Sequence, residues 1–117
     1  YDDWFRAQAE SYENFEYYTA ISRERLPGAS RGEYVDGRIE RDIETFRPFL
    51  ESPRTLIYVC GLEGMQIGLY RMLARHGLLE HYIQVPEEFV GLEPEDWPAE
   101  RMKRRCRPTK RAMIEVY

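Results

Sequence analysis

The sequence has little of what several large classes of protein depend on. Its 117 residues include two cysteines and two histidines, too few and too irregularly spaced to predict a disulfide framework or a metal site. No apolar run approaches the roughly 18 to 20 residues that a membrane-spanning helix needs, and no stretch resembles a cleavable signal. Repeats and low-complexity tracts are absent as well. We therefore expect at most one ordinary domain of a soluble, cytoplasmic protein without bound metal.

Aromatic and charged residues are plentiful. Two tryptophans, nine tyrosines and five phenylalanines in a chain that is 43% hydrophobic are enough to build a core. The formal net charge is −4, but residues 101–111 hold seven basic residues and no acidic one. Such a cluster can receive an acidic protein or a phosphate-bearing ligand, although a solvated helix end explains it equally well. Nucleic-acid binding is not expected, because the chain is acidic and has no base-reading motif.

Residue periodicity predicts helices and strands in alternation. Helices are expected over 2–12, 38–50, 64–76 and 98–105, because apolar residues recur there at helical spacing. Strands are expected over 15–21, 55–60 and 112–117, with 55–60 buried on both faces. Residues 25–33 contain Pro-Gly and Arg-Gly and predict a loop, and residues 84–98 predict an irregular insertion. This alternation indicates an α/β fold with a parallel sheet, whose ligands bind where the strands end.

Chemically useful residues follow each predicted strand. Ser22 and Arg23 can hold a phosphate monoester through charge-assisted hydrogen bonds, or serve as a helix cap and a surface ion pair. Cys60 precedes Gly61, and glycines there let a ligand lie on the backbone at a helix start. The same cysteine would also suit a core position. Tyr117 ends the chain, where a residue is often frayed.

The motif Cys60-Gly-Leu-Glu-Gly-Met65, the tripeptide Ser22-Arg-Glu24, and a glutamate two residues before a final tyrosine are the features of one family. Together they resemble the nicotinamide-binding half of plant-type ferredoxin–NADP reductases, which are FAD-containing flavoenzymes. The resemblance covers nearly the whole chain. It implies hydride transfer between NADP(H) and FAD, and one-electron exchange with a ferredoxin, a flavodoxin or an oxygenase.

The resemblance also implies roles for individual residues. Ser22 and Arg23 match the pair that grips the 2′-phosphate of NADP, and Tyr34 matches the ring that stacks on the adenine. Asp36 departs from the family pattern, in which a neutral amide stands at this place. A carboxylate there would repel a 2′-phosphate and would accept a hydrogen bond from a 2′-hydroxyl. The matching residues therefore favour NADP over NAD, and Asp36 acts against this preference.

At the other strand ends, the resemblance places Cys60 beside the reacting carbon of the nicotinamide. The motif residues that match around it, as part of the coenzyme site, are Gly61, Leu62, Gly64 and Met65. Glu115 matches the residue that orients the nicotinamide and the proton traffic around it. Tyr117 matches the ring that covers the flavin and moves away when the nicotinamide stacks.

The family fold is a doubly wound, Rossmann-like parallel sheet with strand order 3-2-1-4-5, of which only the last three strands are expected here. We therefore expect residues 1–117 to be the C-terminal portion of an NADP-binding domain. The flavin-binding barrel and the first βαβ unit would lie upstream, and activity would require them. Residues 79–92 are longer and more acidic than the family's usual connection. Two alternatives remain open: a nucleotide-binding regulatory or assembly module without redox turnover, and a reductase component of a multi-subunit oxygenase.

Overall fold

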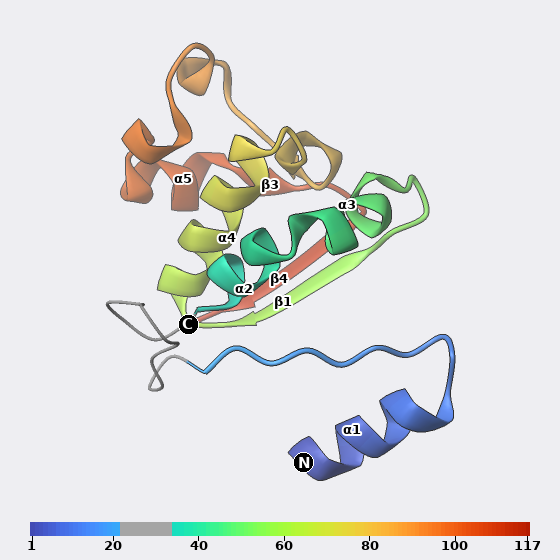
Figure 1. Cartoon of the computed structure of the whole chain (residues 1–117). Coiled ribbons are helices and arrows are strands. Elements are labelled where there is room, and N and C mark those ends of the chain that lie inside the picture. The colour runs from blue at the N-terminus through green and yellow to red at the C-terminus, as the bar shows by residue number, and fades with distance from the viewer. Residues whose placement is uncertain (22–33) are drawn as a thin grey trace. The chain divides into compact units, whose positions relative to one another are not determined.

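The computed structural model describes residues 1–21 and 34–117. The chain divides into two compact units, Tyr1–Glu33 and Tyr34–Tyr117 (Figure 1). In the described residues, no helix is long and apolar enough to cross a membrane.

The first unit is built on helix α1, Asp2–Ser11, close to the predicted range of 2–12. Asp2 and Asp3 lie in its first turn, where carboxylates interact favourably with the helix dipole. Phe5 stacks on Tyr17 and Phe15, with ring centroids 5.2 and 6.4 Å apart. The Tyr17 hydroxyl donates a hydrogen bond to Asp2 at 3.0 Å. The helix is thus held to the following segment by an aromatic cluster and one polar contact.

The strand predicted over residues 15–21 is not formed. These residues have no regular secondary structure, and none of them belongs to the two sheets found in the described residues. The prediction was wrong because aromatic and β-branched composition favours a strand only where a neighbouring backbone completes the ladder. Residues Ser22 and Arg23, and the loop predicted over 25–33, lie outside the described residues.

The sheet of the second unit has two parallel strands. Strand β1, Ile57–Gly61, pairs with β4, Ala112–Val116, in a register that runs from Ile57 beside Ala112 to Gly61 beside Val116. Both strands were predicted, and their parallel pairing confirms the expected mixed α/β arrangement. Helices α2, α3 and α4 lie over one face of this sheet (Figure 1).

The helix predicted over 38–50 is divided in two. Helix α2 is Val35–Arg41 and α3 is Ile43–Glu51, separated at Asp42, whose φ and ψ of −112° and 35° are not helical. The apolar spacing continues across the break, so Ile39, Ile43 and Leu50 all pack against the core. Periodicity alone reports which residues face inward and does not detect one non-helical residue between two helices.

Helix α4, Glu63–Arg75, forms the centre of the core. Tyr70, Met72 and Leu73 are almost completely buried. The helical spacing predicted this for Met72 and Leu73, but not for Tyr70. The next turn ends at Gly77, whose φ of +70° is a conformation that glycine adopts without strain. The core therefore follows the predicted pattern of this helix.

The segment between α4 and β4 includes the irregular insertion predicted over 84–98 and the short helix predicted over 98–105, which forms as Ala99–Arg105. It contains the short elements η1 Leu79–His81, β2 Ile83–Gln84, η2 Glu87–Phe89, η3 Pro94–Asp96, α5 Ala99–Arg105 and β3 Arg107–Pro108. Strands β2 and β3 pair antiparallel, which was not predicted. Phe89 and Trp97 stack with ring centroids 5.0 Å apart, and Arg71 donates to the carbonyls of Pro94 and Trp97 at 3.2 and 2.6 Å. These two carbonyls therefore each have a charged donor.

Strand β1 is buried on one face, not on both as predicted. Val59 points into the core and is 6% exposed, whereas Tyr58 beside it is 60% exposed. A strand alternates its side chains between two faces, and helices cover only one of them in this unit. The apolar run that predicted a fully buried strand therefore has an uncovered side.

Candidate functional site

The carboxyl ends of β1 and β4 bring three predicted site residues together. The register places Cys60 beside Glu115, and the backbone N–H of Tyr117 donates to the carbonyl of Gly61 at 3.0 Å. The Tyr117 carbonyl in turn accepts from the N–H of Glu63 at 3.4 Å, in the first turn of α4. The backbone of the last residue is thus bonded on two sides, while its side chain is 79% exposed. This arrangement leaves an exposed aromatic ring on an anchored backbone.

Two of these residues lie on the uncovered face of the sheet. Cys60 and Glu115 are both exposed, and Tyr58 shares their face because it stands two residues before Cys60. The Tyr58 hydroxyl donates to Glu115 Oε2 at 2.7 Å, and this bond to the carboxylate raises the pKa of the phenol above its ordinary value. A thiol, a phenol and a carboxylate therefore stand on one surface of the sheet.

The turn from β1 to α4 explains why both of its glycines are there. Gly61 has φ of +151°, and a Cβ built on it would lie 2.8 Å from Met65 Cε, so a side chain at this position is strained and crowded. Gly64 is different, because nothing lies within 4 Å of a Cβ built on it. The first glycine is favoured by its positive φ, whereas the second leaves open space over the backbone.

The first turn of α4 also presents an unpartnered donor. The N–H groups of Met65 and Gln66 bond to Leu62 O, at 3.0 and 3.3 Å. The N–H of Gly64 has no partner in the described part of the chain. Leu62, the N-cap residue, provides no side-chain cap and is itself exposed. This helix start can therefore accept a polar ligand against bare backbone.

A pocket of about 550 Å³ opens between α4, α5 and the end of β4. Lys103 lines it and forms ion pairs with Glu63 at 3.0 Å and Glu100 at 2.9 Å. On its inner wall, the buried Gln66 donates to the Tyr70 hydroxyl at 3.1 Å. Cys60, Glu115 and Tyr117, which were singled out from the sequence, also line this pocket. Glu63, Gln66 and Tyr70 were not, and only their helical spacing would have placed them on a common face.

The two cysteines have opposite surroundings. Cys106 follows α5 and is buried, and burial, with a smaller contribution from the Glu88 carboxylate, raises its pKa to about 11. A thiol in this environment stays protonated and unreactive. Cys60 is the exposed one, so the residue that the motif marks is the accessible thiol.

The predicted adenine-binding residues are only partly described. Tyr34 is exposed at the N-cap of α2. The Asp36 carboxyl is turned toward Gly68 on α4, where a Cβ built on the glycine would meet it at 3.1 Å. Ser22 and Arg23, the predicted phosphate ligands, lie outside the described residues, so the structure does not relate them to Tyr34 or to the strand ends.

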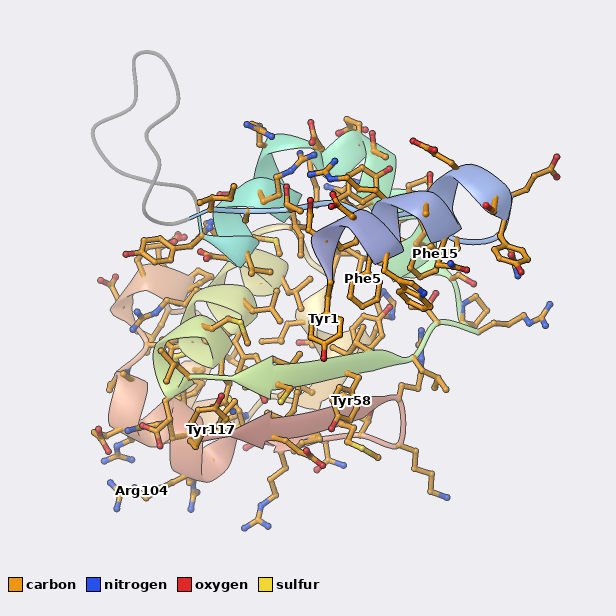
Figure 2. The ribbon with its side chains drawn as sticks, turned by 90° about the horizontal axis from the view of Figure 1, so that it is seen from below. Tyr1, Phe5, Phe15, Tyr58, Arg104 and Tyr117 are labelled. Carbon is orange, nitrogen blue, oxygen red and sulfur yellow. The ribbon has the colours of Figure 1, made fainter. Side chains whose placement is uncertain are left out.

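The basic segment 101–111 divides into paired and unpaired cations. Arg101 and Arg105 pair with Glu88, and Arg111 donates to the carbonyls of Thr55 and Ser52 at 3.1 and 2.5 Å. The exposed cations of the segment without an ion pair to any described residue are Arg104, Arg107 and Lys110. Figure 2 shows Arg104 extending outward from α5. Only part of the cluster predicted from the sequence is thus available to a partner.

No arrangement of three or more His, Cys, Asp or Glu side chains suited to a metal ion occurs in residues 1–21 and 34–117. The chemistry that this edge of the sheet offers is instead that of one thiol, one carboxylate, two aromatic rings and open backbone. These groups are suited to stacking against a planar ligand and to moving or holding a proton beside it.

The sequence is similar to several known proteins that share one name. No protein-family model matches the sequence. The chain is 35% identical over 116 residues to a ferredoxin–NADP reductase of Picosynechococcus, an alignment that covers 99% of this chain and 25% of that protein. It is 36% identical over 62 residues to a ferredoxin–NADP reductase of Spirulina, covering 53% of this chain and 21% of that protein.

A plant protein is similar as well. The chloroplastic leaf isozyme 1 of ferredoxin–NADP reductase from Oryza sativa subsp. indica is 29% identical over 68 residues, which cover 58% of this chain and 19% of that protein. The chain therefore spans about a quarter of the length of the first of these relatives. Cyanobacterial and plant relatives of one name agree with the resemblance carried by the motifs at the strand ends. The chain belongs to the ferredoxin–NADP reductase family.

Proposed function

We propose that this chain is the nicotinamide-binding portion of an NADPH-dependent flavin oxidoreductase. The observation that carries the proposal is the meeting of Cys60, Glu115 and Tyr117 at the carboxyl ends of two adjacent parallel strands. In that role the bound nicotinamide exchanges a hydride with FAD, which exchanges electrons singly with a ferredoxin, a flavodoxin or an oxygenase. A module that only binds a nucleotide would have no use for this set of three residues.

The chain's own residues divide the work in this proposal. Gly64 and the first turn of α4 leave room for a ligand to lie on the backbone, and their open space and unpartnered N–H fit a polar coenzyme. Cys60 flanks the reacting end of the nicotinamide, Glu115 orients it, and Tyr117 covers the flavin until it is displaced. Ser22, Arg23 and Tyr34 hold the 2′-phosphate and the adenine.

The partners follow from the unpaired charges. Arg104, Arg107 and Lys110 are exposed cations with no ion pair to a described residue, and such groups attract an acidic protein at long range. We propose that they receive the electron carrier, while Lys103 is engaged with Glu63 and Glu100. The flavin would be held mainly by a barrel domain of the same protein outside this chain.

The test of the reaction is Cys60→Ala in the complete protein, with Cys106→Ala as the matched control. Loss of the accessible thiol beside the nicotinamide should lower the hydride-transfer rate about fivefold to tenfold, equivalent to about 1 to 1.4 kcal/mol. Binding of 2′-phospho-AMP should hardly change, because that ligand has no nicotinamide. Stopped-flow reduction of the flavin by NADPH measures the rate, and calorimetry measures the binding.

The control separates chemistry from packing. Cys106→Ala removes a buried thiol, so it should lower the unfolding temperature while leaving the rate per folded molecule unchanged. If Cys60→Ala behaved in the same way as Cys106→Ala, the assignment of Cys60 to the reaction would be rejected.

We also propose that the sheet continues beyond β1 as a doubly wound sheet. The N–H of Ile57 bonds to Arg111 and the carbonyl of Gly61 to Tyr117, so the alternation of a parallel ladder turns the peptide groups of Tyr58 and Cys60 toward the other edge. No described residue pairs with that edge. Beside it lies an apolar pocket of about 370 Å³ lined by residues of α2, α3, β1 and α4. A further parallel strand from the N-terminal part of the domain would form hydrogen bonds with the unpaired edge of β1 and would cover the apolar pocket.

Hydrogen exchange at two amides tests this proposal. In the isolated chain the N–H groups of Tyr58 and Cys60 should exchange quickly, whereas those of Val59 and Gly61, which face β4, should be slow. In the complete protein all four should be slow, with at least about a hundredfold change at Tyr58 and Cys60. Fast exchange at these two amides in the complete protein would mean that β1 is an edge strand.

A further inference from the structure

The phenol of Tyr58 lies in contact with the carboxylate assigned to the nicotinamide. Tyr58 and Cys60 are on β1 and Glu115 is on β4, all on the uncovered face of the sheet. Directly beside Tyr58 across the ladder is Met113, and Glu115 stands two residues further along β4. A tyrosine is long enough to reach such a diagonal neighbour, and its hydroxyl lies 2.7 Å from Glu115 Oε2.

Glu115 has few other constraints on its side chain. No cation of the described residues forms an ion pair with it, and the Tyr58 hydroxyl is its side-chain hydrogen-bond partner there. An exposed glutamate samples several rotamers, and a hydrogen bond from a neighbouring phenol selects among them. A short bond between a hydroxyl and a carboxylate is also among the stronger hydrogen bonds in proteins. The direction of the carboxylate is therefore set by β1, the strand that carries Cys60.

We propose that Tyr58 is a positioning residue, which holds the Glu115 carboxylate in the direction needed beside the nicotinamide. This inference deepens the proposed function and rests on it, because it assumes the role given there to Glu115. Tyr58 itself touches neither coenzyme nor flavin in this proposal. Its action passes through Glu115 alone, and the consequences of removing it should disappear when Glu115 is already gone.

The Tyr58 phenol stays protonated, and can donate its hydrogen bond, throughout the neutral pH range. The hydrogen bond to Glu115, followed by desolvation, raises the pKa of Tyr58 above the ordinary value of 10.0. Because the folded-state pKa is the higher one, the bond is fully present below pH 10.0 and is lost as the pH rises through the raised value. Tyr58 therefore remains a donor throughout the neutral range.

The kinetic experiment uses the complete flavin-loaded protein with Tyr58→Phe, Glu115→Gln and the double variant. Tyr58→Phe keeps the ring and loses the hydroxyl, so hydride transfer should slow about threefold to tenfold with KM for NADPH changed less than about twofold. In the Glu115→Gln background the same change should have almost no effect, since the two residues act as one unit. Tyr17→Phe, which removes a phenol-to-carboxylate bond to Asp2 of 3.0 Å, is the matched control and should leave the rate unchanged.

A second measurement needs no activity. In protein labelled at tyrosine Cζ, the Tyr58 resonance is assigned from Tyr58→Phe and titrated by NMR from about pH 8 to pH 11.5. The Tyr58 midpoint should lie above that of the other exposed tyrosines in the wild type and fall toward the ordinary value in Glu115→Gln. An unchanged midpoint in that variant would show that the two side chains do not interact, and would overturn the inference.

The outcomes separate the inference from the proposed function. If Glu115→Gln does not slow hydride transfer while the midpoint still depends on Glu115, the contact exists and the function given to Glu115 is wrong. If Glu115→Gln slows the reaction and Tyr58→Phe does not, the proposed function stands and the positioning role falls. Equal effects of Tyr58→Phe with and without Glu115 would also reject it, because Tyr58 would then act by another route.

Discussion

In the complete protein, Tyr117→Ser is expected to bind both NADP and NAD about tenfold to hundredfold more tightly than the wild type. The reason is competition for one surface, because the Tyr117 ring, which is 79% exposed on an anchored backbone, is proposed to occupy the flavin face that the nicotinamide needs. Stacking of a base on an aromatic side chain is worth about 1 to 3 kcal/mol. Removing the competing ring should therefore strengthen the binding free energy of the coenzyme by a similar amount. Coenzyme titrations followed by the flavin absorbance spectrum measure the change.

The same substitution should weaken the choice between coenzymes. Stacking of the nicotinamide becomes stronger for NADP and NAD alike, whereas the 2′-phosphate interaction at Ser22 and Arg23 stays as it was. Release of the product should slow, so turnover with NADPH should fall despite tighter binding. Tyr117→Phe keeps the ring and should resemble the wild type, and Tyr12→Ser removes another exposed tyrosine as a control. Unchanged affinity in Tyr117→Ser would mean that the ring has no place on the flavin.

The parts of the fold that the sequence predicted well are those that depend on neighbours close in the chain. Helix α4 formed where Leu69, Met72 and Leu73 recur at helical spacing, and it stopped before Gly77 because glycine adopts the positive φ of +70° without strain. Strand β1 formed in a continuous β-branched and aromatic run between Pro53 and the turn into α4. Local signals of this kind need no knowledge of what lies across the molecule.

The failures have a common cause in missing neighbours. Residues 15–21 have strand composition and no strand to pair with in the described chain. Tyr58 was expected inside a sheet covered on both faces and is 60% exposed. Both errors arise because residue composition does not show whether another strand or helix lies beside a segment to pair with it or to cover it.

The candidate site was predictable in outline only. The strand order implied by the resemblance places Cys60 and Tyr117 at the ends of neighbouring parallel strands, and the register then sets Glu115 beside Cys60. The bond from Tyr58 to Glu115 depends on the exact register and a diagonal reach between strands, which sequence alone does not fix. Side-chain alternation would have placed Tyr58 on the face of Cys60, but nothing in the sequence relates it to Glu115.

The two glycines of the turn from β1 to α4 give the other large expected effect, and they should respond in opposite ways. Gly61→Ala forces a side chain onto φ of +151° and against Met65 Cε, 2.8 Å from the new Cβ, so it should lower the free energy of unfolding by about 1 to 3 kcal/mol. Gly64→Ala meets nothing within 4 Å in a helical position and should raise it by about 0.5 kcal/mol, because alanine is the better helix former. Thermal unfolding of the two complete proteins measures both.

Coenzyme binding then separates packing from function at Gly64. If NADP(H) lies on the backbone at the start of α4, the methyl group of Gly64→Ala occupies the space the ligand needs, and affinity should fall about tenfold or more in a protein that is more stable than the wild type. Partial unfolding would not give this result, because it would lower the stability and the apparent coenzyme affinity together. Gly77→Ala, at a positive φ of +70° beyond the other end of α4, is the control and should lose stability with unchanged affinity. Full affinity in Gly64→Ala would place the coenzyme elsewhere on this edge of the sheet, leaving the open backbone at Gly64 without a ligand.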